Sequence, residues 1–406
     1  MLSRRIICIT LAAGSAAIIT IPLVAQQRPA SGPIARYDMR AGTVSGFAAM
    51  GGGGAGMMGM MMGRGAGNSL QHELLLRLGT SRPQLSGVPK ADHFMPSGAK
   101  LGKSVPLITP REEPPAIDRL PQQPRGRILV YWGCGDHAPR GQPVVIDLAK
   151  IAAGQMPAGM WSSTILRDLG PTLANSRTFG RWPNEDGKLA KPDSSLIGAH
   201  RIAANYSPEI AFTLTKDFMA PLRSTNGAAA SGATLLNWNA VPDATGYHAN
   251  LFGGKMGQDG QMGDMVMWSS SASRQFGGGL SDWLSPVQVA ALVRDRTVMA
   301  PATTSCLIPA EVKRDAPDFR VGTLTAFGPE ENFAYPPRPA NPQTAWNLEW
   351  TARVRHRSTT SWMDMPGMPG AMGQQGAEPP PQGECARPRS GGLGGILGGV
   401  MRPPGC

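Results

Sequence analysis

Residues 235–252, LLNWNAVPDATGYHANLF, constrain the fold of this 406-residue chain more than any other stretch. Leu236 and Trp238 alternate with leucine and asparagine, so they share one face of a strand. Val-Pro-Asp at 241–243 interrupts the pattern, because proline cannot donate a ladder hydrogen bond. Alternation resumes at Tyr247. Each of the two aromatic side chains can bury about 150–250 Å². That burial contributes about 4–6 kcal/mol before entropy, so we expect two strands joined by a turn, with both rings in a core.

The spacing L-x-W-x-x-V-x-x-A-x-x-Y in this stretch resembles the B and C strands of fibronectin type III domains. The matching residues are Leu236, Trp238, Val241, Ala244 and Tyr247. The resemblance implies an immunoglobulin-like sandwich in which Trp238 and Tyr247 are core residues. It implies no activity, because that fold hosts many functions.

We expect a mainly β protein with two immunoglobulin-like or β-sandwich domains, short helices and disordered ends. The 52 glycines and 38 prolines make up about a fifth of the chain and concentrate at the ends and in linkers. The expected divisions are a signal peptide at 1–25, a disordered Gly/Met-rich segment at 26–67, a short helix and Pro-rich linker at 68–126, a first β-rich domain at 127–222, a fibronectin-like domain at 233–362 and a disordered tail at 363–406.

Periodicity also predicts individual elements. Leu70, Leu74 and Leu78 share a helical face, which predicts a short helix at 68–78. Ser285 followed by proline predicts a helix that continues to about Val293. Apolar patterns predict strands at 128–132, 210–214, 303–308, 319–327 and 346–354. In the last of these strands, Trp346 and Trp350 face inward and add to the expected core.

The first 25 residues predict export, because two arginines precede a long uncharged apolar segment and a small-residue site before Gln26. An uncleaved membrane anchor is the alternative. Export to the periplasm, the outer surface or the medium would favour disulfides. Cys134, Cys306, Cys385 and Cys406 remain after cleavage and allow three pairings. We favour Cys134–Cys306, because both lie in segments that look folded. Cys385 and Cys406 then pair in the tail or stay free.

Arg353, Arg355 and Arg357 alternate along the last predicted strand and face outward. Same-face residues stand about 6.5–7 Å apart, a spacing that suits sulfate, phosphate or uronate groups on a polymer. The alternative is an edge strand that its charges keep soluble. The net charge of +11 is scattered, with no run of five basic residues, so we expect no nucleic-acid partner. A protein or an anionic polysaccharide of the cell envelope is the favoured partner.

Methionines cluster in Gly-rich stretches, and thioethers are ligands that select Cu(I). One cluster is Met57–Met62. The candidate copper ligands in the other two clusters are Met256, Met262, Met265, Met267, Met363, Met365, Met368 and Met372. Copper-binding motifs of this kind usually have histidines between the methionines, and no histidine lies inside these clusters. The alternative is that the clusters are low-complexity sequence in linkers that tolerate methionine. We therefore expect no cofactor. Copper is the alternative that an experiment should test.

No residue pattern in the sequence predicts catalysis. Cys134 and His137 are close in sequence, but a disulfide beside a turn explains them as well as a metal site or a nucleophile. Familiar hydrolase and zinc motifs are absent. We therefore expect an exported, non-enzymatic structural or interaction module. A periplasmic copper-binding protein is one alternative. A hydrolase is another, and a cleft where His137, His200 or His248 meets carboxylates would favour it.

Overall fold

The computed structural model describes residues 32–50, 69–83, 87–110, 126–155, 162, 166, 170–183, 190–257, 262–276, 279–280, 282–341 and 344–365. Within these ranges the protein is mainly β, as the sequence predicts. The expected signal peptide and the tail beyond 365 lie outside the described residues.

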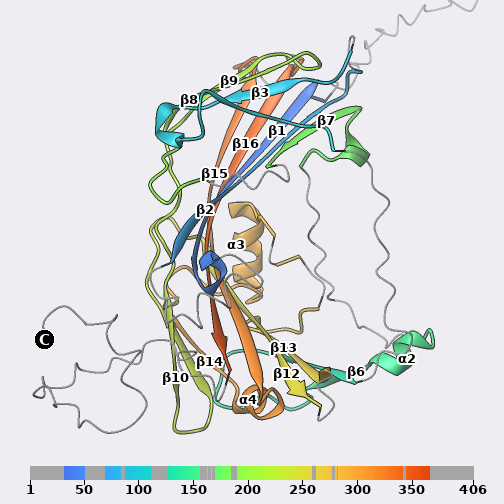
Figure 1. Cartoon of the computed structure of the whole chain (residues 1–406), viewed down its shortest axis with the longest axis vertical. Helices are drawn as coiled ribbons and strands as arrows, with labels where there is room; N and C mark the ends of the chain where they lie inside the picture. The colour runs from blue at the N-terminus through green and yellow to red at the C-terminus, as the bar shows by residue number, and fades with distance from the viewer. Residues whose placement is uncertain are drawn as a thin grey trace, which may run out of the picture.

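The largest sheet has nine strands in the order β6-β5-β13-β12-β15-β16-β1-β2-β7. In that order their bounds are Val144–Asp147, Arg127–Trp132, Met262–Ser269, Gly246–Met256, Phe319–Tyr335, Trp350–Asp364, Ala35–Gly46, Leu70–Thr80 and Thr178–Trp182. Neighbours are antiparallel except that β13 runs parallel to β5 and β1 runs parallel to β16. The longest strands extend over much of the length of the molecule (Figure 1).

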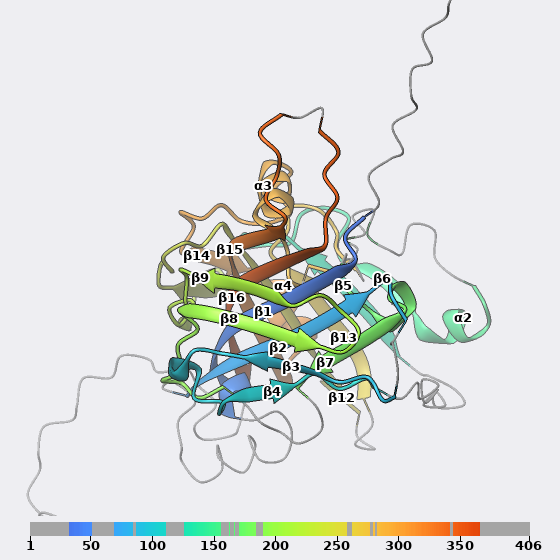
Figure 2. The same cartoon turned by 90° about the horizontal axis from the view of Figure 1, so that it is seen from above.

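Two smaller sheets cover the inner face of the nine-stranded sheet, which is the face that carries Val354. The three-stranded sheet has the order β10-β11-β14, with bounds Ser224–Ala228, Thr234–Trp238 and Ser305–Ile308. The four-stranded sheet has the order β4-β3-β8-β9, with bounds Ser104–Pro106, Ala91–Phe94, Gly198–Ala204 and Ile210–Leu214. Figure 2 shows the four-stranded sheet as a separate layer next to β16, β1 and β2.

Each small sheet closes its own hydrophobic core against the large sheet. Tyr37 and Leu76 belong to the core beneath the four-stranded sheet, and Tyr247 and Leu324 belong to the core beneath the three-stranded sheet. The 17-residue β15 and the 15-residue β16 contribute to both cores. The described fold is therefore two sandwiches that share one continuous sheet. The upper sandwich in Figure 1 contains the four-stranded sheet, and the lower sandwich contains the three-stranded sheet.

Three short helices complete the described fold: α2 (Leu148–Ala152), α3 (Pro286–Arg294) and α4 (Ala310–Asp315). The predicted helix at 285–293 is confirmed as α3. Ser285 caps it by accepting a hydrogen bond from the backbone N–H of Gln288 at 3.2 Å. α3 packs against Phe327 on the outer face of the large sheet, opposite the small sheets. Single 3-10 turns occur at Phe47–Met50, Ser97–Ala99 and Leu173–Asn175.

The two aromatic residues of the stretch at 235–252 lie between opposed layers, as predicted. Trp238 ends β11 in the three-stranded sheet, and Tyr247 is the second residue of β12 in the nine-stranded sheet. Their ring centroids are 5.6 Å apart, and their exposed fractions are 6% and 0%. The turn between them is closed by a hydrogen bond from the Ala244 N–H to the Val241 carbonyl at 3.2 Å. Asp243 adopts a φ of 63° there, as the third residue of a type II turn requires.

Four sequence predictions about the elements need correction. The expected Pro-rich linker within 68–126 contains β3 and β4, which pair with each other in the four-stranded sheet. The segment 68–78 is not a helix, because Leu70–Thr80 forms β2 between β1 and β7. Part of the segment 26–67 is ordered, because Ala35–Gly46 forms β1. The boundary between domains at 127–222 and 233–362 does not separate the sheets, since β5 pairs with β13 and both belong to the nine-stranded sheet.

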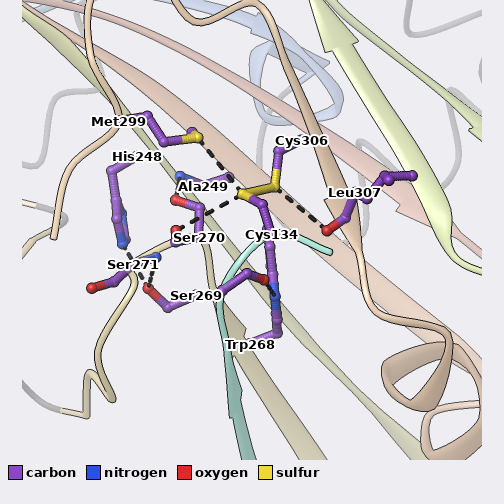
Figure 3. Close-up of a disulfide and its surroundings, with 11 residues drawn as sticks. Cys134, His248, Ala249, Trp268, Ser269, Ser270, Ser271, Met299, Cys306 and Leu307 are labelled. Atoms are coloured by element: carbon purple, nitrogen blue, oxygen red, sulfur yellow. Dashed lines mark hydrogen bonds between the residues drawn. A yellow bond between two sulfur atoms is a disulfide. The ribbon is translucent and has the colours of Figure 1, made fainter. Parts of the chain in front are cut away.

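The predicted Cys134–Cys306 disulfide joins the two layers of the lower sandwich. Cys134 follows β5 of the large sheet, and Cys306 lies in β14 of the three-stranded sheet. Their Cα atoms are 5.3 Å apart, and 172 residues separate them in sequence. Figure 3 shows the bond beside the Met299 sulfur, which lies 3.9 Å from the Cys134 sulfur. Cys385 and Cys406 lie outside the described residues.

Candidate anion-binding face

The predicted arginine ladder lies on a central strand and not on an edge. β16 pairs with β15 on one side and with β1 on the other. All three arginines are on the outer face, but they are more buried than the outward-facing ladder predicts. Arg353 keeps 25% of its side-chain surface exposed, whereas Arg357 keeps 17% and Arg355 keeps 4%. Carboxylates and the segment before α3 cover the lower arginines. The binding role of the ladder stays a prediction.

One buried carboxylate holds three guanidinium groups together. The Asp38 side chain is 1% exposed. It accepts hydrogen bonds from Arg353 at 3.0 Å, from Arg355 at 3.0 and 3.1 Å, and from Arg40 at 2.9 Å. Arg40 also reaches Asp282 at 3.3 Å. These charge-assisted hydrogen bonds fix the planes of the guanidinium groups and leave positive charge in excess around Asp38.

Strand register extends this group into a row across four strands. Asp38 lies opposite Arg353 on β16 and Arg77 on β2, and Arg77 lies opposite Arg181 on β7. Adjacent strands are about 4.8 Å apart, so the row is about 14 Å long. Arg36 is two residues before Asp38 and shares its face. Arg36, Arg77 and Arg353 are half-buried, and Arg181 is exposed.

The lower part of the ladder is held by the residues that precede α3. Arg355 donates a hydrogen bond to the carbonyl oxygen of Trp283. The guanidinium carbon of Arg357 lies 4.1 Å from the centroid of the Trp283 ring, and Arg357 also binds Glu73 at 2.9 Å. These contacts make Arg355 and Arg357 structural, so the upper arginines are the ones that can reach a ligand.

Two cavities flank Pro171 at the upper end of the sheet. The first measures about 460 Å³, and the second measures about 530 Å³. Arg36 and Arg353 line the first cavity, whereas Arg77 and Arg181 line the second. Each cavity therefore has two arginines in its wall.

The first cavity also offers an aromatic ring and an amide. Trp346 was expected in the core of the last strand, but β16 begins at Trp350, and Trp346 lies before it as a half-buried wall of this cavity. Its indole N–H donates to the Pro336 carbonyl at 2.9 Å, which fixes the ring. Asn332 lies on the same wall. Trp350, the other predicted tryptophan of this strand, is in the core at 7% exposed.

Positive charge dominates this part of the outer face. We define the arginine face as Arg36, Arg40, Arg77, Arg181, Arg353, Arg355 and Arg357. Within the described residues its neighbouring carboxylates are Asp38, Glu73, Asp282 and Glu330. The planar guanidinium fork matches carboxylate, sulfate and phosphate groups, so the surface is suited to anions.

The sequence pointed to one strand of this face and missed the other three. In 35–41, ARYDMRA, inward residues alternate strictly with Arg36, Asp38 and Arg40, which is a strand signal. The Gly-rich stretch that follows favours disorder, so the sequence analysis predicts no strand there. Arg77 lies in the segment 68–78, where the leucine spacing predicts a helix. Only the register brings Arg77 and Arg181 beside the predicted arginines.

The described candidate copper ligands lie at the lower end of β12, β13 and β16. Met256 and Met262 are paired residues of β12 and β13, and Met265 and Met267 follow on β13. Met363 lies near the end of β16, and Met365 follows it. Met57–Met62, Met368 and Met372 lie outside the described residues. The described residues contain no group of three or more His, Cys, Asp or Glu that could hold a metal ion. Copper binding stays a prediction.

The histidines named for the hydrolase alternative are not gathered in one site. His137 is exposed and lies 3.2 Å from Glu311, at the surface beside the disulfide. His200 is buried, and its ring nitrogens contact His93 and the Leu196 carbonyl. His248 contacts the hydroxyl of Ser269 at 3.0 Å, and burial lowers its pKa to about 4. In the described chain none of the three forms a histidine–carboxylate pair inside a cleft.

No protein-family model matches the chain, and a comparison with curated protein sequences gives no match either. Among the described residues, no helix has the length and hydropathy that a transmembrane span needs.

Proposed function

We propose that the protein is an exported, non-enzymatic interaction module that binds an anionic polysaccharide of the cell envelope on its arginine face. The observation that carries this proposal is the row Arg353, Asp38, Arg77 and Arg181, in which three arginines on three strands accompany a single buried carboxylate. A polymer with a charge on each sugar can place successive anionic groups along a row of about 14 Å. The guanidinium group of Arg353, which Asp38 already holds, loses little entropy when it binds.

An acidic sugar suits the first cavity better than a simple inorganic anion does. Arg36 and Arg353 can bind the acid group, while the Trp346 ring offers a flat apolar surface and Asn332 offers amide hydrogen bonds. This combination matches a sugar ring that has one apolar face and several hydroxyl groups. Export, which the leader predicts, would place the protein beside such polymers and away from nucleic acid.

We also infer that residues 224–364 form a sandwich of the fibronectin type III kind. The sheet β10-β11-β14 faces the sheet β13-β12-β15-β16. Labelled in chain order, the first is A-B-E and the second is C′-C-F-G, which is the division of strands in immunoglobulin-like folds. The aromatic pair Trp238 and Tyr247, from strands B and C, supports this assignment. On this reading β1, β2 and β7 extend the sheet beyond strand G and create the arginine face.

The test is binding of alginate, a polymer of uronic acids, with neutral dextran as the control polymer. We expect saturable alginate binding that weakens as salt rises, because the attraction is screened. Arg36→Gln and Arg181→Gln should each weaken it by about fivefold. Arg223→Gln is the matched control, because Arg223 is exposed next to β10 and outside the arginine face. Equal binding to dextran, or equal affinity in all three variants, would contradict the proposal.

A further inference from the structure

A third cavity, of about 490 Å³, lies on the outer face of the lower sandwich, away from the arginine face. Its floor is the nine-stranded sheet at β13, β12 and β15, and its other described wall is formed by Gln275, Phe276, Gly279 and Leu280. The volume is within the range of about 300–1,000 Å³ that is typical of small-molecule sites. The site is concave and built mainly on strands, which position side chains more precisely than loops do.

The floor of this cavity is divided into one polar row and one apolar row. Strand register places Ser269, Asn250 and Thr323 side by side across the three strands. Two residues further along the strands, Met267, Phe252 and Val321 form the neighbouring row. The rows are about 6.7 Å apart. A ligand that covers both rows must therefore have a hydrogen-bonding edge and an apolar face.

Asn250 and Thr323 are the polar groups of the floor that a ligand can use. Neither side chain makes a hydrogen bond to any other described residue, and both are half-buried. Ser269, by contrast, already bonds His248 and the Ser271 N–H. The Asn250 amide has donors and an acceptor, so a ligand that covers it must supply both functions in return.

The described wall of the cavity carries no charge at neutral pH. Its only titratable side chain is His248, which burial keeps neutral by lowering its pKa to about 4. A charged ligand would lose its hydration there without gaining a counter-charge. A wholly apolar ligand would leave the Asn250 amide without hydrogen bonds. Both classes are disfavoured, which leaves a neutral molecule that has polar and apolar sides.

We propose that this cavity binds a neutral saccharide of one or two rings. Adjacent hydroxyl groups, or a hydroxyl beside an acetamido group, offer donors and acceptors together to Asn250 and Thr323. The C–H face of the ring then lies on Phe252 and Met267, and Phe252 is 38% exposed and open to contact. This site is independent of the arginine face, because it uses other strands and selects uncharged sugars.

The test is calorimetric titration of the full exported chain with two neutral disaccharides, N,N′-diacetylchitobiose and maltose, and with glucuronate as the charged control. We expect saturable one-to-one binding of at least one disaccharide and no binding of glucuronate at this site. Asn250→Leu and Thr323→Val should each weaken disaccharide binding by about tenfold, because each removes hydrogen bonds without removing bulk. Asn237→Leu on β11 and Thr225→Val on β10, both at exposed positions, are the matched controls and should bind as the parent does.

The proposal is overturned if neither disaccharide binds at tens of millimolar, or if Asn250→Leu and Thr323→Val bind them as tightly as the controls. Circular dichroism shows whether each variant retains the β fold before its disaccharide affinity is compared with that of the controls. If Asn250→Leu misfolds, the isosteric Thr323→Val variant still tests the proposal. Alginate binding is measured on the same samples. Loss of one activity with retention of the other identifies which of the two proposals fails.

Discussion

At the residue scale, the core of the upper sandwich contains a chain of hydrogen bonds in a fixed direction. The Tyr37 hydroxyl donates to His93 Nδ1 at 2.7 Å, and His93 Nε2 lies 3.0 Å from His200 Nδ1. His200 Nε2 must donate to the Leu196 carbonyl at 2.7 Å, because a carbonyl only accepts. That bond assigns both tautomers, and each ring donates one hydrogen bond and accepts one. This direction holds while both histidines are neutral, and protonation of both rings would place two N–H donors face to face between His93 and His200.

Acid should therefore destabilise the protein. Burial is the main cause that lowers the pKa of His93 and His200, and also of His72, His248 and His356. A histidine with a lowered folded-state pKa binds fewer protons when folded than when unfolded. Its contribution is complete above the ordinary pKa of about 6.5 and declines as the pH falls below that value. Each such histidine lowers the free energy of unfolding by up to about 1.4 kcal/mol per pH unit.

Urea unfolding at several pH values between about 7.5 and 5 measures how stability depends on pH. This interval extends about one to two units on either side of the ordinary histidine pKa. We expect stability to fall steadily below about pH 6.5. The variant His200→Gln keeps a neutral polar side chain and should show a shallower pH dependence than the parent. His137→Gln is the control for removal of an imidazole outside the buried set, because His137 is exposed on the surface. A flat profile across this interval would show that the buried rings are not the acid-sensitive groups.

At the element scale, β2 shows why one strand was predicted as a helix. Leucines at 70, 74 and 78 fit a helical face, and leucines at 74, 76 and 78 fit a strand face equally well. The second pattern is the one realised, because β1 and β7 supply hydrogen-bond partners on both sides. By contrast, Trp238, Tyr247 and α3 could be placed from the sequence, since their turn and capping signals are local. The elements that failed depend on partners distant in sequence.

The disulfide gives a prediction at this scale. Cys134 and Cys306 are 172 residues apart, and a loop of this length stabilises the folded protein by about 5 kcal/mol in the chain-entropy model. The double variant Cys134→Ser and Cys306→Ser should lose most of that amount in urea unfolding. Reduction of the parent protein should have the same effect and should not alter the double variant. If reduction destabilised both proteins equally, a different bond would be responsible.

At the scale of the whole molecule, the sequence could not place the domain boundary, because strands that are distant in sequence pair with each other. β1 near the start pairs along its full length with β16 near the end, and β5 pairs with β13. Each predicted domain therefore contributes strands to the same sheet. The segment between β9 and β10 also crosses the inner face between the two cores. Thr43 and Ser45 donate to its carbonyl oxygens, and its Leu222 N–H donates to Ser358. These buried polar contacts connect the two sandwiches at their junction.

A shared sheet should make the two sandwiches unfold as one cooperative unit. Leu76 in the upper core and Leu236 in the lower core are both 0% exposed, so truncation to alanine should cost about 2–5 kcal/mol at either site. Because β15 and β16 form part of both cores, neither sandwich can unfold without breaking strands that the other needs. We therefore expect Leu76→Ala to lower the unfolding free energy seen by hydrogen exchange in β11 as much as that seen in β8. Leu236→Ala should do the same in the reverse direction. Two separate urea transitions, with each variant moving only one, would mean that the junction yields first and that the sandwiches are independent domains.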